Sequence, residues 1–162
     1  MARIVCKDLE HCDVAGYEFV KRILMPYSDS RHAPNVFAYA LTIAKRQGAS
    51  ILVVSVVNKD LIKHWVNGTP SRESAMSLGS VDMLKSGIKK MEQQARKFGV
   101  RFDYAIIPSK NVSDTLLSMI DTQKVDLVVM GTKGNGMFKE MLLGRVSSAV
   151  AINAKCPVLL VK

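Results

Sequence analysis

The stretch of sequence that decides the fold runs from Val125 to Val150 and reads VDLVVM, GTKGNGMFKEMLLG and RVSSAV. Its first part is a short apolar and β-branched run, which is typical of a buried parallel strand. A loop follows with glycines at positions 131, 134 and 144, in the spacing G-x2-G-x9-G. Because glycine has no Cβ, such a loop can turn tightly and lie close to a bound group.

A helix is expected directly after this loop. Beyond Gly144, residues recur at helical spacing, namely Val146, Ala149, Val150 and Asn153. The first N–H groups of a helix have no intrahelical partner, and the helix dipole favours negative charge at that end. The pattern therefore predicts an anion-binding loop between a strand and a helix.

Two common phosphate motifs do not match this loop. A Walker A loop needs Lys and Ser or Thr directly after its last glycine, whereas Gly136 is followed by Met137. The dinucleotide fingerprint G-x-G-x-x-G needs a third glycine at the position that Lys139 occupies. The anion loop therefore belongs to another class.

The rest of the chain alternates predicted strands with predicted helices. Apolar runs predict five strands, at Val20–Tyr27, Ile51–Val57, Arg101–Ile107, Leu127–Met130 and Val158–Val161. Helical spacing predicts helices over about 35–47, over about 81–98, after an Asn111 cap, and after Gly144. This alternation is typical of an α/β fold with an open parallel sheet and helices on both faces.

Two segments fall outside the alternation. Residues 1–18 have no sustained period and are interpreted as an N-terminal extension. Residues 58–80 are polar, contain Gly68, Pro70 and Gly79, and predict a long connection such as a lid. Within it, His64 and Trp65 are candidates for a lid or partner contact, with simple packing as the alternative.

Length and composition favour a single domain. The chain has 162 residues, of which 48% are hydrophobic, and this is enough for a core. Its apolar runs stop short of the roughly 18–20 residues that cross a bilayer, and its start lacks the apolar centre of a signal peptide. These features predict a cytoplasmic protein without membrane association.

The net charge of +9 raises the alternative of a nucleic-acid or acidic partner. Its Lys and Arg residues are scattered, as in KSGIKKMEQQARK, and lack the interleaved aromatic residues of single-strand binders. Solvated helix faces therefore explain the charge better than nucleic-acid binding does. The same charge would help to capture a polyphosphate.

The side chains that commonly carry chemistry form no recognisable catalytic set. The three cysteines are an odd number, which argues against a disulfide framework. Cys6 and Cys12 flank His11, a weak zinc signal, and are interpreted as structural or free thiols. The histidines lack a partner at catalytic spacing, and Asp29 is the one candidate for Mg²⁺. Binding is therefore favoured over catalysis.

The loop and the strands around it resemble the universal stress protein family. Its ATP-binding members carry G-x2-G-x9-G after a strand much like DLVVMG, and their last strand is similar to CPVLLVK. The resemblance covers Phe19 to Lys162, which implies a universal stress protein domain over 19–162. It also implies a Rossmann-like fold, related to the adenine nucleotide alpha hydrolases, with strand order 3-2-1-4-5. In that order, a crevice is expected at the carboxyl ends of strands one and four.

The resemblance further implies a set of nucleotide-binding residues. The segment Pro26, Tyr27 and Ser28 matches a Pro-x-Asp segment whose carboxylate meets adenine, so Ser28 replaces that Asp. Val56 matches a residue that packs on adenine. Gly131 lies near the ribose, and the phosphate side is formed by Met130, Gly134, Gly144 and Val146, with Lys133 and Ser147 as helpers. Arg145 stands where the pattern has Ser or Thr, and extends either into solvent or over phosphate oxygens.

Three functional hypotheses follow. The first is a regulatory stress-response protein that binds ATP, or AMP or ADP, with Mg²⁺ left open and slow hydrolysis permitted by the resemblance. The second is a dimeric interaction module of the same family that has lost the nucleotide, motivated by Ser28 and Arg145. In either case, the resemblance implies a homodimer through the last strand. The third is a binder of acidic partners that depends on the net charge.

Overall fold

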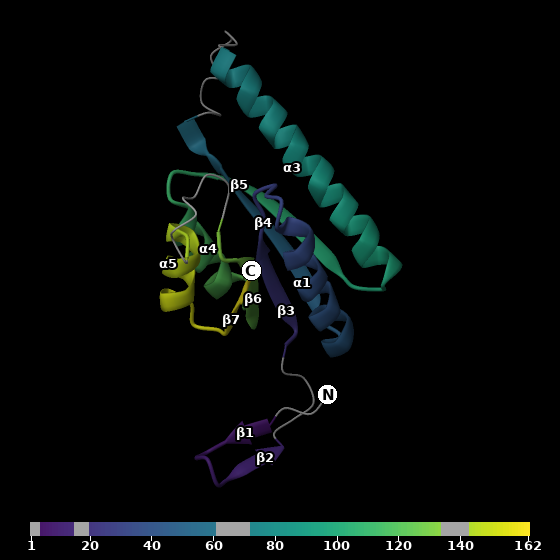
Figure 1. The fold of residues 1–162 in the computed structure, drawn as a ribbon, viewed down its shortest axis with the longest axis vertical. Helices are drawn as coiled ribbons and strands as arrows, with labels where there is room; N and C mark the ends of the chain where they lie inside the picture. Colours follow the sequence, from purple (N-terminus) through teal and green to yellow (C-terminus); the bar gives the residue numbers. More distant parts are fainter. Residues whose placement is uncertain (1–3, 15–19, 61–71, 134–142) are drawn as a thin grey trace.

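A computed structural model describes residues 4–14, 20–60, 72–133 and 143–162 of the chain. A five-stranded parallel sheet forms its centre, in the order β5-β4-β3-β6-β7 (Figure 1). The strands are β3 (Arg22–Pro26), β4 (Ser50–Asn58), β5 (Phe102–Ser109), β6 (Leu127–Gly131) and β7 (Val158–Val161). Counted along the chain, these are the five predicted strands in the order 3-2-1-4-5. The predicted fold class is therefore confirmed.

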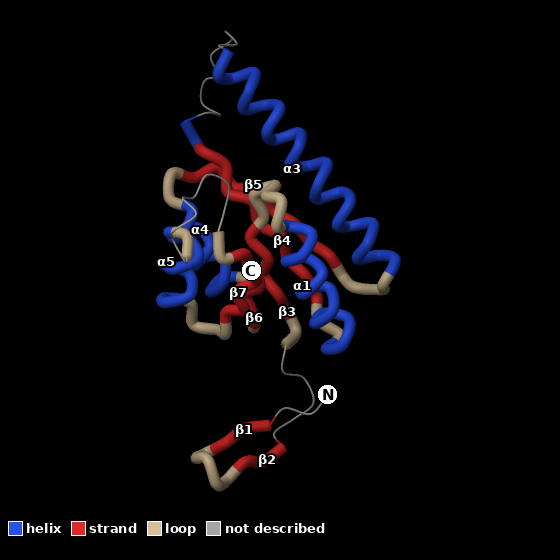
Figure 2. The backbone as a smooth tube through the Cα atoms, viewed as in Figure 1, coloured by secondary structure: helices blue, strands red, loops and turns tan. Residues whose placement is uncertain are grey.

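Helices cover both faces of this sheet (Figure 2). One face packs on α1 (Ala33–Gln47) and α3 (Arg72–Lys97), and the other on α4 (Val112–Thr122) and α5 (Arg145–Asn153). Successive strand residues point to opposite faces, so Ile23 and Met25 join the first core and Leu24 joins the second. In the described part of the chain, none of the helices combines the length and apolar character needed to cross a membrane.

The amino end of the sheet is held together by one carboxylate. Asp126, just before β6, accepts hydrogen bonds through Oδ2 from the backbone N–H groups of Lys21 at 2.8 Å and Arg22 at 2.9 Å. The Asp126 N–H in turn donates to the Arg22 carbonyl at 2.9 Å. These bonds fix the register of β3 beside β6, the two strands whose opposite ends carry the candidate site.

Helix α3 begins earlier than the apolar stripe over residues 81–98 predicts. Helix α3 starts at Arg72, so the prediction that residues 58–80 form one polar connection is wrong for 72–80. A single glycine such as Gly79 costs a helix only about 1 kcal/mol relative to Ala, which a helix of this length tolerates. The predictions for His64 and Trp65 lie outside the described residues.

The N-terminal extension contains a hairpin that its sequence does not predict. Strand β1 (Ile4–Cys6) pairs antiparallel with β2 (Cys12–Val14), and the pairing sets Cys6 directly opposite Cys12. The two cysteines form a disulfide, so the interpretation as free thiols is wrong. The odd cysteine count was misleading because one bond is local to the hairpin and Cys156 lies apart in the domain.

Candidate functional site

The candidate site lies where the chain leaves the neighbouring strands β3 and β6 toward opposite faces of the sheet. The segment after β3 leads to α1, which packs in the first core, and the segment after β6 leads to α5, which packs in the second. In open parallel sheets, ligands bind outside the carboxyl ends of the strands at such a switch point. The topology therefore brings the 26–30 segment to the same end of the sheet as residues 131–133 and 144–147.

Thr132 ties the exit of β6 to the entrance of α5. Its N–H donates to the Val161 carbonyl at 3.0 Å, while its carbonyl accepts from the Gly144 N–H at 2.8 Å. The same carbonyl accepts a bond from the Ser147 hydroxyl at 2.7 Å, and that hydroxyl also lies 3.0 Å from the Gly144 carbonyl. The start of α5 is thus fixed beside the end of β6. No sequence pattern singles out Thr132, because its backbone rather than its side chain makes these contacts.

The glycines that flank this junction are not required by the packing of the described residues. Gly144 has φ −75° and ψ 163°, a backbone conformation that any residue adopts. A Cβ on Gly144 would lie 3.4 Å from Ser147 Oγ, and one on Gly131 would lie 3.5 Å from the Lys133 carbonyl oxygen. Both are ordinary contact distances, so an alanine would fit among the described residues at either position.

The amino end of α5 differs from that of α4. The start of α4 is capped by its own side chains: Asn111 Oδ1 accepts from the Asp114 N–H at 3.1 Å, and Asp114 supplies a negative charge in the first turn. In α5, the cap residue Gly144 makes no side-chain bond, and the first turn has no acidic residue. The first intrahelical bond at this end runs from Ser148 N to Gly144 O. The N–H groups of residues 145–147 therefore precede the helical hydrogen-bond ladder and are suited to an anion.

Tyr27, which the sequence places in the nucleotide segment, is part of the core beneath α3. Its side chain is buried, and its hydroxyl donates to Asp29 Oδ1 at 2.9 Å. Burial, and then the neighbouring Asp29 carboxylate, raise the pKa of Tyr27 to about 12. Asp29 itself has a positive φ of 47°, and Ser28 between them is exposed. The segment therefore presents Ser28 outward while Tyr27 anchors it.

Gly87 of α3 makes room for that anchor. A Cβ at Gly87 would lie 2.8 Å from Tyr27 Cζ and would overlap the hydroxyl. Real Cβ atoms essentially never come that close to another heavy atom. Sequence reasoning missed this contact, although a glycine inside a helical pattern is a known sign of close packing.

The remaining predicted residues differ in how far their side chains are buried. Met130 is buried in the second core, while Val56 and Val146 are half-buried against the same core. Pro26 and Lys133 are half-buried, Ser147 is buried, and Arg145 is exposed. Gly134 lies outside the described residues. The structure thus gathers residues 131–133 and 144–147 at one junction, whereas Val56 lies on β4, separated from β6 by β3.

A metal site is a separate question from the anion loop. Over residues 4–14, 20–60, 72–133 and 143–162, His, Cys, Asp and Glu side chains do not gather in groups of three or more that could hold a metal ion.

Together, the sheet order and the opposite exits of β3 and β6 define a doubly wound α/β protein with a topological switch point between these two strands. The model of the universal stress protein family matches residues 20–162. The chain therefore belongs to the universal stress protein family, and the resemblance drawn from its glycine spacing is confirmed.

Curated relatives agree with this assignment. A universal stress protein of Methanocaldococcus jannaschii is 30% identical over 150 residues, covering 91% of this chain and 85% of the relative. A universal stress protein of Thermus aquaticus is 32% identical over 142 residues, covering 88% and 98% respectively.

Solved structures share the fold. UspA from Lactobacillus plantarum superposes with a TM-score of 0.73 at 20% identity, covering 91% of this chain and 100% of that one. An Archaeoglobus fulgidus universal stress protein in complex with dAMP gives 0.62 at 18% identity, covering 89% and 98%. An Arabidopsis thaliana family member with AMP bound gives 0.63 at 16% identity, covering 88% and 91%.

Proposed function

We propose that this chain binds an adenine nucleotide at the carboxyl ends of β3 and β6. The observation that carries the proposal is the uncapped start of α5, which lies against the end of β6 with a glycine on each side. Family members with dAMP and with AMP bound support the choice of ligand. Within the described part of the chain, a side-chain cap closes the amino end of α4 and none closes that of α5, so the proposal places the phosphates at α5.

In this proposal, the phosphates accept hydrogen bonds from the N–H groups of residues 145–147. Arg145 is exposed at the first position of α5, where its guanidinium can pair with phosphate oxygens in a forked geometry. A cation at a helix start is unfavourable unless an anion lies beside it, so a bound phosphate would also explain Arg145. The Ser147 hydroxyl is engaged by Thr132, and its function is to hold the phosphate-binding turn in place.

The base would lie toward the 26–30 segment and Val56. Ser28 and Asp29 are both polar and exposed, and they lie where the family resemblance implies a Pro-x-Asp segment. Val56 is half-buried and offers an apolar surface for an aromatic ring. ATP, ADP and AMP share this base, and the phosphate junction favours the forms with more negative charge. The function is binding and regulation in the cytoplasm, with no catalytic residue assigned.

Calorimetry with ATP and AMP tests this proposal, with GTP as the control for base recognition. We expect binding of both adenine nucleotides below millimolar concentration. A Gly144→Ala variant should fold, since its Cβ meets ordinary contacts, but should bind at least about tenfold more weakly. Ile152→Ala is the matched control on α5, because Ile152 is exposed at the far end of the same helix. Absence of heat with millimolar ATP and AMP would contradict the proposal.

A homodimer through β7 is a second part of the proposal. Strand β7 pairs with β6 on one side and is an edge of the sheet, and its residues Val158, Leu159 and Leu160 are only half-buried. An apolar edge of this kind favours pairing with a second copy. If the nucleotide proposal fails, a dimer of this kind would point to the interaction module instead. Sedimentation at micromolar concentration should show a dimer that a Leu159→Lys substitution dissociates, whereas a monomeric wild type would contradict it.

A further inference from the structure

The N-terminal hairpin carries a disulfide that the nucleotide proposal does not use. Cys6 and Cys12 are joined across paired strands, and every residue from 4 to 14 is exposed. Both sulfur atoms therefore belong to a surface element outside the two cores of the domain. An exposed disulfide can be attacked by an incoming thiolate, in contrast to structural disulfides buried in a core.

The turn between the cysteines is held by bonds that do not depend on the disulfide. The Asp8 carboxylate accepts from the backbone N–H of Glu10 at 3.0 Å and of His11 at 2.9 Å, and it lies 2.7 Å from His11 Nδ1. The Lys7 N–H also donates to the His11 carbonyl at 2.9 Å. The three contacts made by the Asp8 carboxylate lower the pKa of Asp8, led by its bond to the His11 side chain. None of these bonds involves a cysteine side chain, so reduction of the disulfide breaks none of them.

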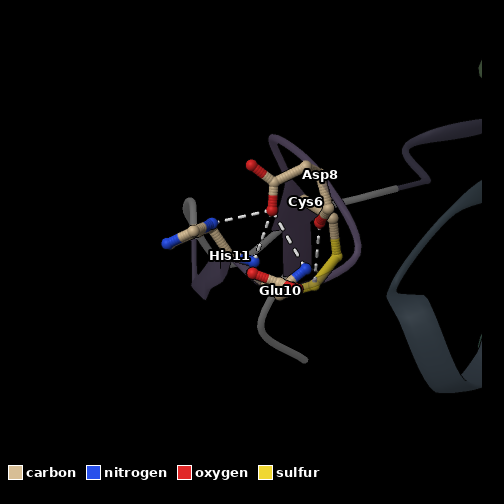
Figure 3. Close-up of polar contacts among 5 residues, drawn as sticks. Cys6, Asp8, Glu10 and His11 are labelled. Carbon is tan, nitrogen blue, oxygen red and sulfur yellow. Dashed lines mark hydrogen bonds and ion pairs between the residues drawn. A yellow bond between two sulfur atoms is a disulfide. The ribbon is translucent and has the colours of Figure 1, made fainter.

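Figure 3 shows that the hydrogen bonds of Asp8 and the disulfide lie on different sides of the turn. The Asp8 carboxylate faces His11 and the Glu10 backbone, while the disulfide lies on the other side of the loop and the His11 ring points away from it. Cys12 Sγ lies 4.0 Å from the Asp8 carbonyl oxygen, which would accept a bond from the thiol after reduction. Among the residues drawn in Figure 3, the Asp8 and His11 side chains contact each other and not the disulfide.

We propose that Cys6 and Cys12 form a thiol–disulfide exchange site whose substrates are protein dithiols. A thiolate of the partner attacks one Sγ, the S–S bond breaks, and its electron pair leaves on the other Sγ, which takes up a proton. The second partner thiol loses its proton and attacks the mixed disulfide, releasing the first Sγ as a thiol. Two electrons and two protons pass from the dithiol to the hairpin, and the partner becomes a disulfide.

A protein partner is favoured over a small thiol by the surface around the disulfide. Ile4 pairs with Val14, two positions from the Cys6–Cys12 pair, so these four side chains share one face of the hairpin. Ile4 is 68% exposed, Val14 is 66% exposed, and Leu9 at the turn is fully exposed. An extended apolar segment beside the partner's dithiol could cover this face, whereas glutathione offers little apolar surface.

The test uses the full chain with Cys156→Ser, so that only the hairpin cysteines react. The protein is equilibrated over a range of reduced-to-oxidised glutathione ratios, thiols are trapped by alkylation, and the products are resolved by mass spectrometry. We expect interconversion of dithiol and disulfide within that range. We also expect a thioredoxin-type dithiol protein to reduce the disulfide at least about tenfold faster than dithiothreitol at equal dithiol concentration. A Cys6–Cys12 pair that stays wholly reduced or wholly oxidised over that range overturns the proposal. Reduction by the thioredoxin-type protein that is no faster than reduction by dithiothreitol overturns the assignment of a protein partner.

Two variants of the turn separate this site from a hairpin that is only structural. Asp8→Ala removes the carboxylate that holds the turn and should lower the equilibrium constant for disulfide formation by about tenfold. Glu10→Ala is the matched control, because Glu10 reaches Asp8 through its backbone N–H, and it should change the constant less than about twofold. Thermal unfolding of the domain should be unchanged in both variants. Equal equilibrium constants for disulfide formation in the two variants would contradict the positioning function of Asp8.

Discussion

Two glycines of α3 should respond to the same substitution with opposite sign. A Cβ on Gly79 meets no heavy atom within 4 Å, whereas one on Gly87 would lie 2.8 Å from Tyr27 Cζ. In an open helical position, Gly→Ala stabilises by roughly 0.5–1 kcal/mol, because Ala loses less backbone entropy on folding. Gly79→Ala should therefore raise the free energy of unfolding by about that amount.

At Gly87, the free energy that alanine gains in a helix is outweighed by the overlap of its Cβ with the buried Tyr27 side chain. Overpacking costs about 1–3 kcal/mol, and displacing Tyr27 would also weaken its bond to Asp29, since bonds to charged groups contribute about 1.5–3 kcal/mol. The net effect of Gly87→Ala is a destabilisation of about 1–3 kcal/mol. For a chain of this length, the melting temperature changes by about 2–4 °C for each kcal/mol.

Urea unfolding followed by circular dichroism measures both variants, and a third variant identifies the cause. In a Tyr27→Leu background, the ring that meets the new Cβ is absent, so Gly87→Ala should become neutral or stabilising. If Gly87→Ala stabilises the wild-type chain as Gly79→Ala does, that result would contradict the close contact between Tyr27 and Gly87 of α3. A loss of stability that persists in the Tyr27→Leu background would place its cause elsewhere.

Three further predictions concern stability. Because the pKa of Tyr27 is raised from 10.0 to about 12, the native state keeps a proton that the unfolded state loses, so stability should fall as pH rises through this window. Urea titrations at several pH values should show this loss in the wild type and not in Tyr27→Phe. Asp126→Ala removes the acceptor of two backbone N–H groups and should lower the free energy of unfolding by about 2–3 kcal/mol. Asp121→Ala is its control, because it breaks only an exposed pair with Lys155, and it should lower that free energy by less than about 1 kcal/mol in the same assay. Asn111→Ala removes the cap of α4 and should cost about 1 kcal/mol; no loss on chemical unfolding would refute the cap.

The fold was predictable because its strands are apolar or alternate apolar with polar residues, and because helical patterns separate them. The stretch before Gly131 shows this, since β6 is buried on both faces and its sequence carries no polar alternation. The strand order came from the family resemblance, because hydrophobic periodicity does not distinguish neighbouring strands. The hairpin was not predictable, since strands of three residues such as Ile4–Cys6 show no measurable period.

The junction between β6 and α5 was predictable from the glycine pattern, whereas its function as a binding site stays a prediction. Glycine spacing marks the junction because backbone approach depends on residue type, and Gly144 does begin the helix. Tyr27 was assigned to the site by its place in a motif, whereas its ring is in the core. That outcome depends on Gly87, which lies 60 residues along the chain. Contacts of this kind depend on tertiary packing, which local pattern does not contain.

The central claim is that the uncapped start of α5 receives the phosphates of an adenine nucleotide. Amide chemical shifts from ¹H–¹⁵N spectra, recorded while ATP is added to the labelled chain, test it most directly. We predict that the N–H signals of Arg145, Val146 and Ser147 move with saturating behaviour, while those of the capped start of α4, such as Asp114, stay in place. Saturable shifts elsewhere with unchanged signals at 145–147, or no shifts at millimolar ATP, would contradict the claim.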